Sequence, residues 1–146
     1  MPQSVSFIGA GAFSGCTKLT TVELPAAIEA VRDRTFRNCT ELKQITIPEG
    51  IRYIGAAAFQ NAVSLQNLTL PQSLLTICDN AFEGSGVGAG LVLPSALRTI
   101  GSRAFAGCMR LSSLTIPADV RKMGSQAFAD GASPVDHLSS LKLGTR

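Results

Sequence analysis

Residues 100–117 read Ile-Gly-Ser-Arg-Ala-Phe-Ala-Gly-Cys-Met-Arg-Leu-Ser-Ser-Leu-Thr-Ile-Pro. The same order of apolar, glycine, cysteine and proline positions recurs along the chain at intervals of 23 residues. Its most regular column is aromatic and consists of Phe13, Phe36, Phe59, Phe82, Phe105 and Phe128. A fixed period of this length is typical of repeat proteins, in which each unit packs on its neighbours. The sequence therefore predicts one structural unit repeated six times.

Other columns keep the same period independently of the phenylalanines. An aliphatic residue or methionine stands five positions before each phenylalanine, at Ile8, Val31, Ile54, Ile77, Ile100 and Met123. Proline follows the last apolar residue of five units, at Pro25, Pro48, Pro71, Pro94 and Pro117. Between phenylalanine and proline, residues 19–24 keep the Leu-x-x-Leu-x-Leu spacing of leucine-rich repeats with one valine.

Within one unit, the apolar spacing predicts a strand and a return segment. From residue 19 to residue 24 the apolar positions alternate, with Val22 and Leu24 facing inward, as in a β-strand. Residues 9–16 carry apolar side chains at helical spacing and are expected to form a short helix or 3₁₀ turn. The predicted fold class is an α/β repeat, a leucine-rich repeat solenoid with one parallel strand and one short helical or 3₁₀ return per unit.

The repeat phase predicts a single leucine-rich repeat domain over residues 1–146. Its six units begin near residues 8, 31, 54, 77, 100 and 123. Residues 84–90 of the fourth unit are glycine-rich, and because glycine favours mobility over packing, we expect a loosened return segment there. The sixth unit is degenerate, because its leucines fit the pattern only with an insertion around residues 132–135.

The set of spaced positions closely resembles the BspA-like leucine-rich repeat family, which occurs in bacterial and protist surface proteins. The resemblance extends from residue 2 to about residue 143. It implies a leucine-rich repeat fold. It also implies one functional alternative, in which the chain is a segment of a secreted cell-surface adhesin or antigen that contacts host or matrix proteins.

Composition argues against several classes of partner. Thirteen basic and ten acidic residues give a modest net charge of +3. The absence of tryptophan and of a basic run argues against nucleic acid as a partner. No stretch approaches the roughly 18 apolar residues of a membrane helix, so direct membrane insertion is not expected.

The compartment follows from two weaker observations. The first residues lack the basic start and apolar run of a secretory signal. Together with cysteines that are expected to be unbridged, this favours an intracellular protein. Met1 and Pro2, however, occupy the strand-end positions of a unit whose earlier part is missing, so the chain is expected to begin in mid-unit. A cell-surface location follows if it is a fragment.

The reactive residue types do not form a catalytic or metal pattern. Cys16, Cys39 and Cys108 share one column with small residues, which predicts a packing slot for buried thiols, although Cys16 and Cys39 are near enough in phase to bridge. Ser133, Asp136 and His137 are crowded into one insertion and cannot form a triad. We therefore expect no enzyme activity, no catalytic residues, no bound metal and no cofactor.

The outward positions of the predicted sheet are rich in hydroxyl and amide groups. They are Thr21, Glu23, Gln44, Thr46, Asn67, Thr69, Val92, Ser113 and Thr115. Repeat proteins often bind partners on this extended surface, and a plain solvated sheet face is the alternative. The row is therefore a candidate partner-binding face.

A second candidate surface is basic. Arg52, Arg98 and Arg121 share a column that Leu75 interrupts, and Lys122 adjoins it. Because guanidinium groups suit carboxylates, this column is a candidate site for an acidic protein partner, with solvated arginines as the alternative.

These features predict a non-enzymatic protein-interaction module or a structural subunit of a larger assembly. Its protein partner, whose identity the pattern does not give, would bind through the sheet face or through the open ends of the solenoid. End-to-end or edge-strand contacts are possible there, because the first strand has no preceding strand.

Overall fold

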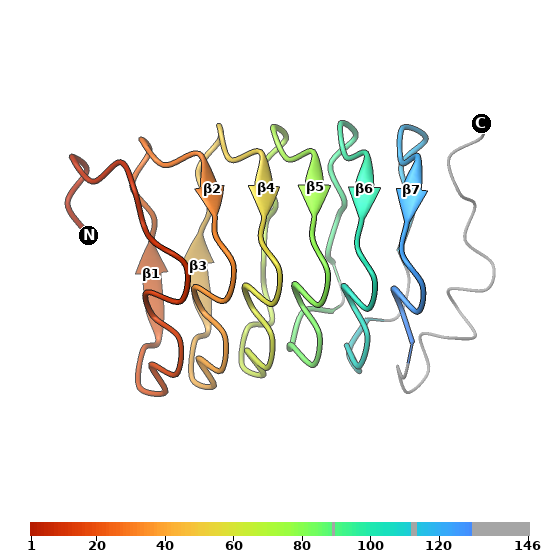
Figure 1. The fold of residues 1–146 in the computed structure, drawn as a ribbon. Helices are drawn as coiled ribbons and strands as arrows, with labels where there is room; N and C mark the ends of the chain where they lie inside the picture. Colours follow the sequence, from red (N-terminus) through yellow and green to blue (C-terminus); the bar gives the residue numbers. More distant parts are fainter. Residues whose placement is uncertain (89, 112–113, 130–146) are drawn as a thin grey trace.

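The structure is a computed structural model that describes residues 1–88, 90–111 and 114–129. Successive units stand side by side along one axis, and the chain passes once around the stack in each unit (Figure 1). The described part of the chain contains seven short strands and no helix. All strand pairs are parallel, and each joins residues 23 apart in the sequence.

The larger sheet has five strands, each of two residues. They are β2 (Ala30–Val31), β4 (Tyr53–Ile54), β5 (Thr76–Ile77), β6 (Thr99–Ile100) and β7 (Lys122–Met123), in that spatial order. The second residue of every strand belongs to the aliphatic column that precedes the phenylalanines, and it points into the core. The sequence analysis identified this column by its period, but it predicted no strand there.

The smaller sheet lies where the sequence predicted strands, but it stops after two units. It pairs β1 (Thr21–Glu23) with β3 (Gln44–Thr46). In the third unit the predicted alternation persists without a strand, since Leu68 is buried between exposed neighbours. The expectation of one strand per unit at this position is therefore correct for β1 and β3 and wrong for the described residues 65–70 and 90–93.

The predicted helical returns are wrong, because the segment at residues 9–16 forms successive turns. Alternate N–H groups bond three residues back, as from Cys16 to the Phe13 carbonyl at 3.1 Å. The intervening N–H groups reach the next unit, as from Phe13 to the Thr35 carbonyl at 2.9 Å. The backbone enters the left-handed region at Gly11, with φ of +69°, which an α-helix does not allow. The turns thus form a third ladder between units.

Residues other than glycine also adopt this left-handed backbone conformation in later units. They are Arg34, Asn38, Ala57, Asn61, Asn80, Arg103 and Gln126, with φ between +55° and +63°. In the six residues before Gln126, the ladder holds this conformation, since each N–H donates to a carbonyl of the following unit. The interunit bonds therefore offset a conformation that is unfavourable for most residues.

The phenylalanines form one continuous stack in the core. Neighbouring ring centroids lie 5.3–5.5 Å apart, with interplanar angles of 4–9°. Phe36, Phe59 and Phe82 are fully buried, whereas Phe13 in the first unit is only partly covered. The rings lie beside the buried aliphatic residues of both sheets, so one core runs the length of the described units.

The glycine-rich part of the fourth unit is packed rather than loosened. A Cβ on Gly86 would lie 2.4 Å from the Val63 carbonyl oxygen, and one on Gly88 would lie 2.4 Å from Cβ of Arg110. Val87 is fully buried and fills the core one position before the column where other units carry leucine. The two glycines therefore allow close approach of the flanking units, and the expectation of a loosened segment is wrong for the residues described.

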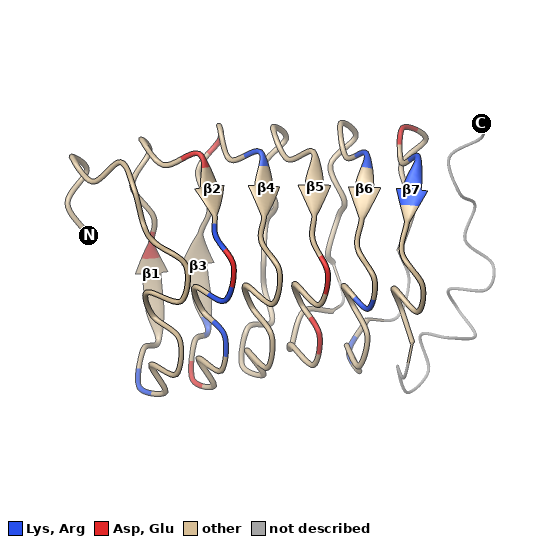
Figure 2. Cartoon of the chain, in the orientation of Figure 1, with Lys and Arg blue, Asp and Glu red and all other residues tan. Residues whose placement is uncertain are grey.

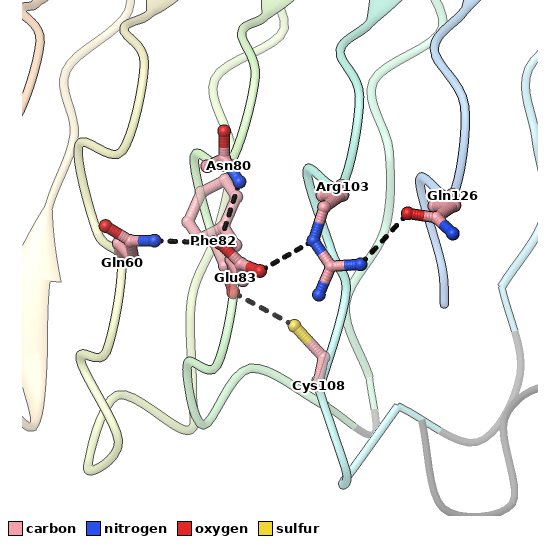
Figure 3. Close-up of polar contacts among 7 residues, drawn as sticks. All are labelled: Gln60, Asn80, Phe82, Glu83, Arg103, Cys108 and Gln126. Atoms are coloured by element: carbon pink, nitrogen blue, oxygen red, sulfur yellow. Dashed lines mark hydrogen bonds and ion pairs between the residues drawn. The ribbon is translucent and has the colours of Figure 1, made fainter. Parts of the chain in front are cut away.

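A polar cluster joins four units on the turn side (Figure 3). The Glu83 carboxylate accepts hydrogen bonds from Gln60 Nε2 and Asn80 Nδ2, both at 2.7 Å, and from Arg103 Nε at 2.8 Å. Arg103 Nη1 also donates to Gln126 Oε1 at 3.1 Å. Burial opposes ionisation of Glu83, but the hydrogen bonds and the guanidinium charge outweigh it and lower the pKa of the carboxyl group.

Truncating the centre of the ring stack is expected to destabilise the fold strongly. Phe59→Ala should lower the free energy of unfolding by about 3–5 kcal/mol, because a buried aromatic ring is replaced by a cavity. The measurement is urea denaturation followed by circular dichroism. Phe13→Ala, the same substitution at a partly exposed ring, should cost clearly less. Equal losses at both sites would contradict a stack held by burial.

Removing the charge of the polar cluster is expected to have a pH-dependent cost. Glu83→Gln should lower the free energy of unfolding at pH 7, because Gln60, Asn80 and Arg103 lose an ionised acceptor. The folded-state pKa lies below the unfolded value of about 4.3, so the wild-type advantage is present above that pH. It is lost as the pH falls through the folded-state pKa.

Urea denaturation of both proteins at neutral and at acidic pH checks this prediction. The exposed Glu41→Gln substitution is the matched control and should change stability little at either pH. A gap between wild type and Glu83→Gln that stays constant down to about pH 3 would contradict the role assigned to the ionised carboxylate.

Candidate functional site

The outward residues of the smaller sheet and of the third unit beside it line a shallow groove, which we call the polar face. The groove has a volume of about 360 Å³. Its polar lining comes from Thr21, Gln44, Thr46, Glu49, Asn67 and Thr69. A neighbouring hollow of about 360 Å³ shares three of these residues and extends to Lys43, Ser64 and Gln66. The structure thus brings together five of the nine side chains that the sequence analysis predicted for the partner-binding face.

The remaining nominated residues lie apart from this groove. Glu23 is exposed at the end of β1, and Thr115 is exposed in the fifth unit. Val92 is 70% exposed and does not line the groove. Ser113 lies outside the described residues. The polar face is therefore confined to the first three units.

The polar face offers neutral hydrogen-bonding groups. Its threonine hydroxyls and its asparagine and glutamine amides can each donate and accept. In addition, β3 has a strand neighbour on one side only, towards β1. Because the backbone groups on its other edge are not used by a sheet partner, the groove combines side-chain and main-chain polar atoms. This arrangement suits an uncharged polar segment of a protein.

The predicted basic column divides into two parts. Arg52, Arg98 and Arg121 are all exposed at the starts of β4, β6 and β7 (Figure 2). Leu75 separates Arg52 from the others, since it donates its N–H to Arg52 and accepts from Arg98. Arg98 and Arg121 lie in adjacent units, and the Arg121 N–H donates to the Arg98 carbonyl at 2.8 Å.

Lys122 completes a cluster with the last two arginines, which we call the basic cluster: Arg98, Arg121 and Lys122. Its N–H also approaches the Arg98 carbonyl, at 3.3 Å, and its side chain is exposed. Three cations are therefore gathered over two neighbouring units. Arg52 stands outside the basic cluster.

The sequence did not predict a second groove on the outer face of the larger sheet. This groove has a volume of about 450 Å³ and spans β5 to β7. Its lining includes Thr76, Cys78, Asp79, Thr99 and Lys122. The glycine column that follows these strands could have indicated the groove. Positions without side chains leave a trough beside a row of outward threonines.

The buried thiols have a more specific role than filling a packing slot. Cys39 Sγ donates to the Phe13 carbonyl, and Cys108 Sγ donates to the Phe82 carbonyl, both at 3.1 Å (Figure 3 shows the second). Each thiol thus reaches the phenylalanine of the preceding unit. Burial raises the pKa of Cys39, and raises the pKa of Cys108 to about 11. Both thiols are therefore protonated at neutral pH.

The other two cysteines are partly exposed, and none of the four is bridged. Cys16 lies in the first unit. Cys78 lies in the second groove, where burial and then the nearby carboxylates of Asp33 and Asp79 raise its pKa. Cys78 stands where other units carry glycine. At Gly101, in the next unit, a Cβ would lie 2.5 Å from Asp79 Oδ1.

The structure can be searched for a metal site and for a membrane-spanning helix only over the residues that it describes. Among residues 1–88, 90–111 and 114–129, no three histidine, cysteine or acidic side chains are grouped as a metal site. In the same ranges, no helix has the length and apolar character needed to cross a membrane. The crowded Ser133, Asp136 and His137 lie outside the described residues.

Solved structures of leucine-rich repeat proteins are similar to this fold. A leucine-rich repeat protein of T. pallidum matches with 31% identity and a TM-score of 0.70, over 80% of this chain and 61% of that one. A leucine-rich repeat protein from Bacteroides ovatus ATCC 8483 matches with 26% identity and a TM-score of 0.66, over 88% and 42% respectively. The chain therefore spans less than two thirds of either protein. A comparison with curated proteins gave no match.

The family model described as BspA type leucine rich repeat region matches residues 6–134 in six copies. This range includes all seven strands and the whole phenylalanine stack. On the evidence of a match over most of its length and of the parallel-strand repeat just described, the chain belongs to the BspA-type leucine-rich repeat family.

Proposed function

We propose that the chain is a non-enzymatic protein-interaction module, or a structural subunit of a larger assembly, that binds a protein partner through the polar face. The observation that carries the proposal is the groove that gathers Thr21, Gln44, Thr46, Asn67 and Thr69 from three successive units. Repeat proteins commonly present such extended surfaces to partners. The partner segment is expected to be polar and uncharged, because hydroxyl and amide groups dominate the lining.

The non-enzymatic character is supported by the state of the reactive side chains. The Glu83 carboxylate already accepts hydrogen bonds from three neighbouring side chains, so it is engaged within the fold. The thiols of Cys39 and Cys108 are buried, protonated and bonded to carbonyls, whereas a nucleophilic cysteine needs a lowered pKa. These groups are used for structure.

The alternative function is that of a cell-surface adhesin, and family membership favours it. BspA-type repeats occur in surface proteins, and this chain spans only 61% and 42% of the two related structures. The same polar face would then contact a host or matrix protein. Surface biotinylation of intact source cells separates the two candidates, because an adhesin is labelled and an intracellular subunit is not.

Strand addition is a second route to assembly. β1 and β2 stand first in their sheets, so each has a strand neighbour on one side only. A partner strand could extend either sheet through main-chain hydrogen bonds. This route does not use the polar face, so substitutions in the groove would leave it intact.

Substituting the polar face is expected to abolish partner binding. Thr46→Arg with Thr69→Arg should reduce capture of a specific partner from an extract of the source cells by about tenfold, because two long cations would fill the groove. The readout is quantitative mass spectrometry of the captured proteins. Circular dichroism verifies that the variant is folded.

The matched control carries Ser14→Arg and Thr17→Arg, which change the same charge at exposed positions of the turn side. This control should capture the same partners as the wild type. If the groove variant retained every partner that the control retains, the polar face would not be the binding site.

A further inference from the structure

The second groove has a floor that side chains cannot fill. A Cβ on Gly101 would lie 2.4 Å from the Asp79 amide nitrogen, and one on Gly124 would lie 2.2 Å from the Ser102 amide nitrogen. These contacts are far shorter than normal packing distances, so both positions require glycine. The trough is therefore a fixed consequence of how closely adjacent units approach each other.

Above this floor, the outward residues of three strands form a hydroxyl row that ends in a cation. Thr76 pairs with Thr99 in register, and Thr99 pairs with Lys122. All three line the groove. Threonine hydroxyls at the strand spacing can bond the main chain of an extended segment that crosses the strands. The groove thus offers several weak polar contacts and one charged contact to the same ligand.

The basic cluster lies at the rim of this groove where the strands start, and Lys122 is its member that lines the groove. Arg98 and Arg121 immediately precede β6 and β7, and Lys122 is the exposed first residue of β7. Within the described residues, none of the three side chains has a hydrogen-bond or ion-pair partner. Like charges in adjacent strands repel one another. An anionic ligand would relieve this repulsion.

The opposite rim has the opposite charge. Asp79 lies just after β5 and lines the groove, and its Oδ1 accepts the Ser102 N–H at 2.8 Å. This carboxylate would repel acidic groups near the strand ends and leave the basic cluster at the strand starts as their favoured position. The two rims therefore fix where the charged part of a ligand must lie.

From these observations we propose that the second groove binds an extended acidic peptide segment, whose carboxylates contact Arg98, Arg121 and Lys122. The proposal rests on the proposed role as a protein-interaction module, but not on the polar face. A nucleic acid fits less well, because three cations over two units do not form a phosphate track and no aromatic side chain lines the groove for base stacking.

The first test measures binding of a fluorescein-labelled hexaglutamate peptide to the full chain by fluorescence anisotropy at low salt. The expected affinity is about tenfold higher than for hexaglutamine, and it should fall at high salt because the contacts are screened. Arg98→Glu with Arg121→Glu should weaken hexaglutamate binding by about tenfold. The matched control Lys18→Glu with Arg37→Glu makes the same change in net charge at exposed positions away from the groove, and it should change hexaglutamate binding by less than about twofold.

A second readout locates the peptide. Cys78 lies in the groove and Cys16 lies in the first unit, and both are partly exposed. At saturating hexaglutamate, most of the groove sites should be occupied. The rate of iodoacetamide modification should then fall by about fivefold at Cys78 and stay the same at Cys16. Peptide mass spectrometry resolves the two sites without any substitution, so the result does not depend on a variant that must fold.

Three outcomes would overturn the proposal. They are equal affinity for hexaglutamate and hexaglutamine, an unchanged rate at Cys78, and binding of oligothymidylate with the same dependence on Arg98 and Arg121. The last result would identify a general polyanion site. The polar-face variant Thr46→Arg with Thr69→Arg should still bind hexaglutamate, so failure of the acidic-peptide site and failure of the polar face are distinguishable.

Discussion

The stacked phenylalanine rings set the distance at which every other contact between units must form. Ring centroids repeat at 5.3–5.5 Å, and each internal ring is fully or almost fully buried. The N–H of Phe59 donates to the Ala81 carbonyl at 2.7 Å, so the residue that fixes the spacing also makes an interunit bond. Aromatic packing and main-chain bonding therefore impose the same period. Both candidate grooves follow from that period, because it aligns equivalent side chains in rows.

The sequence predicted the parts of the fold that depend on the identity of single residues. The phenylalanine and proline columns revealed the period. In β1 and β3 a buried residue stands between two exposed ones, which confirms the predicted alternation. The five-stranded sheet was missed because a strand of two residues carries one inward side chain and therefore shows no alternation. The prediction of a helical return was wrong because a spacing of three residues, as between Phe13 and Cys16, occurs both in helices and in successive turns. Paired glycines at Gly11 and Gly15 were the available signal for turns.

The sequence predicted which residues of the candidate sites form rows along the repeat, but not how these rows combine into grooves and clusters. The sequence placed Thr46 and Thr69 in one row and Arg98 and Arg121 in another, and both rows exist as exposed positions. It did not show that the groove would be confined to the first three units, since that depends on how the side chains of each row are placed in space. The contacts of Glu83 join two different columns, so a single period could not reveal them.

The turn ladder has a direction that the sheets lack. Parallel strands exchange hydrogen bonds both ways, whereas the alternate N–H groups that form the turn ladder donate to a carbonyl of the next unit, as from Gly11 to Asp33 and from Phe105 to Ala127. The peptide dipoles of this column therefore add along the stack. A stack that begins at any unit presents unpaired carbonyls on its leading turn, and one that ends at any unit presents unpaired amides. Unlike a two-way sheet edge, this column is electrically polar: cations are favoured at its first turn and anions at its last.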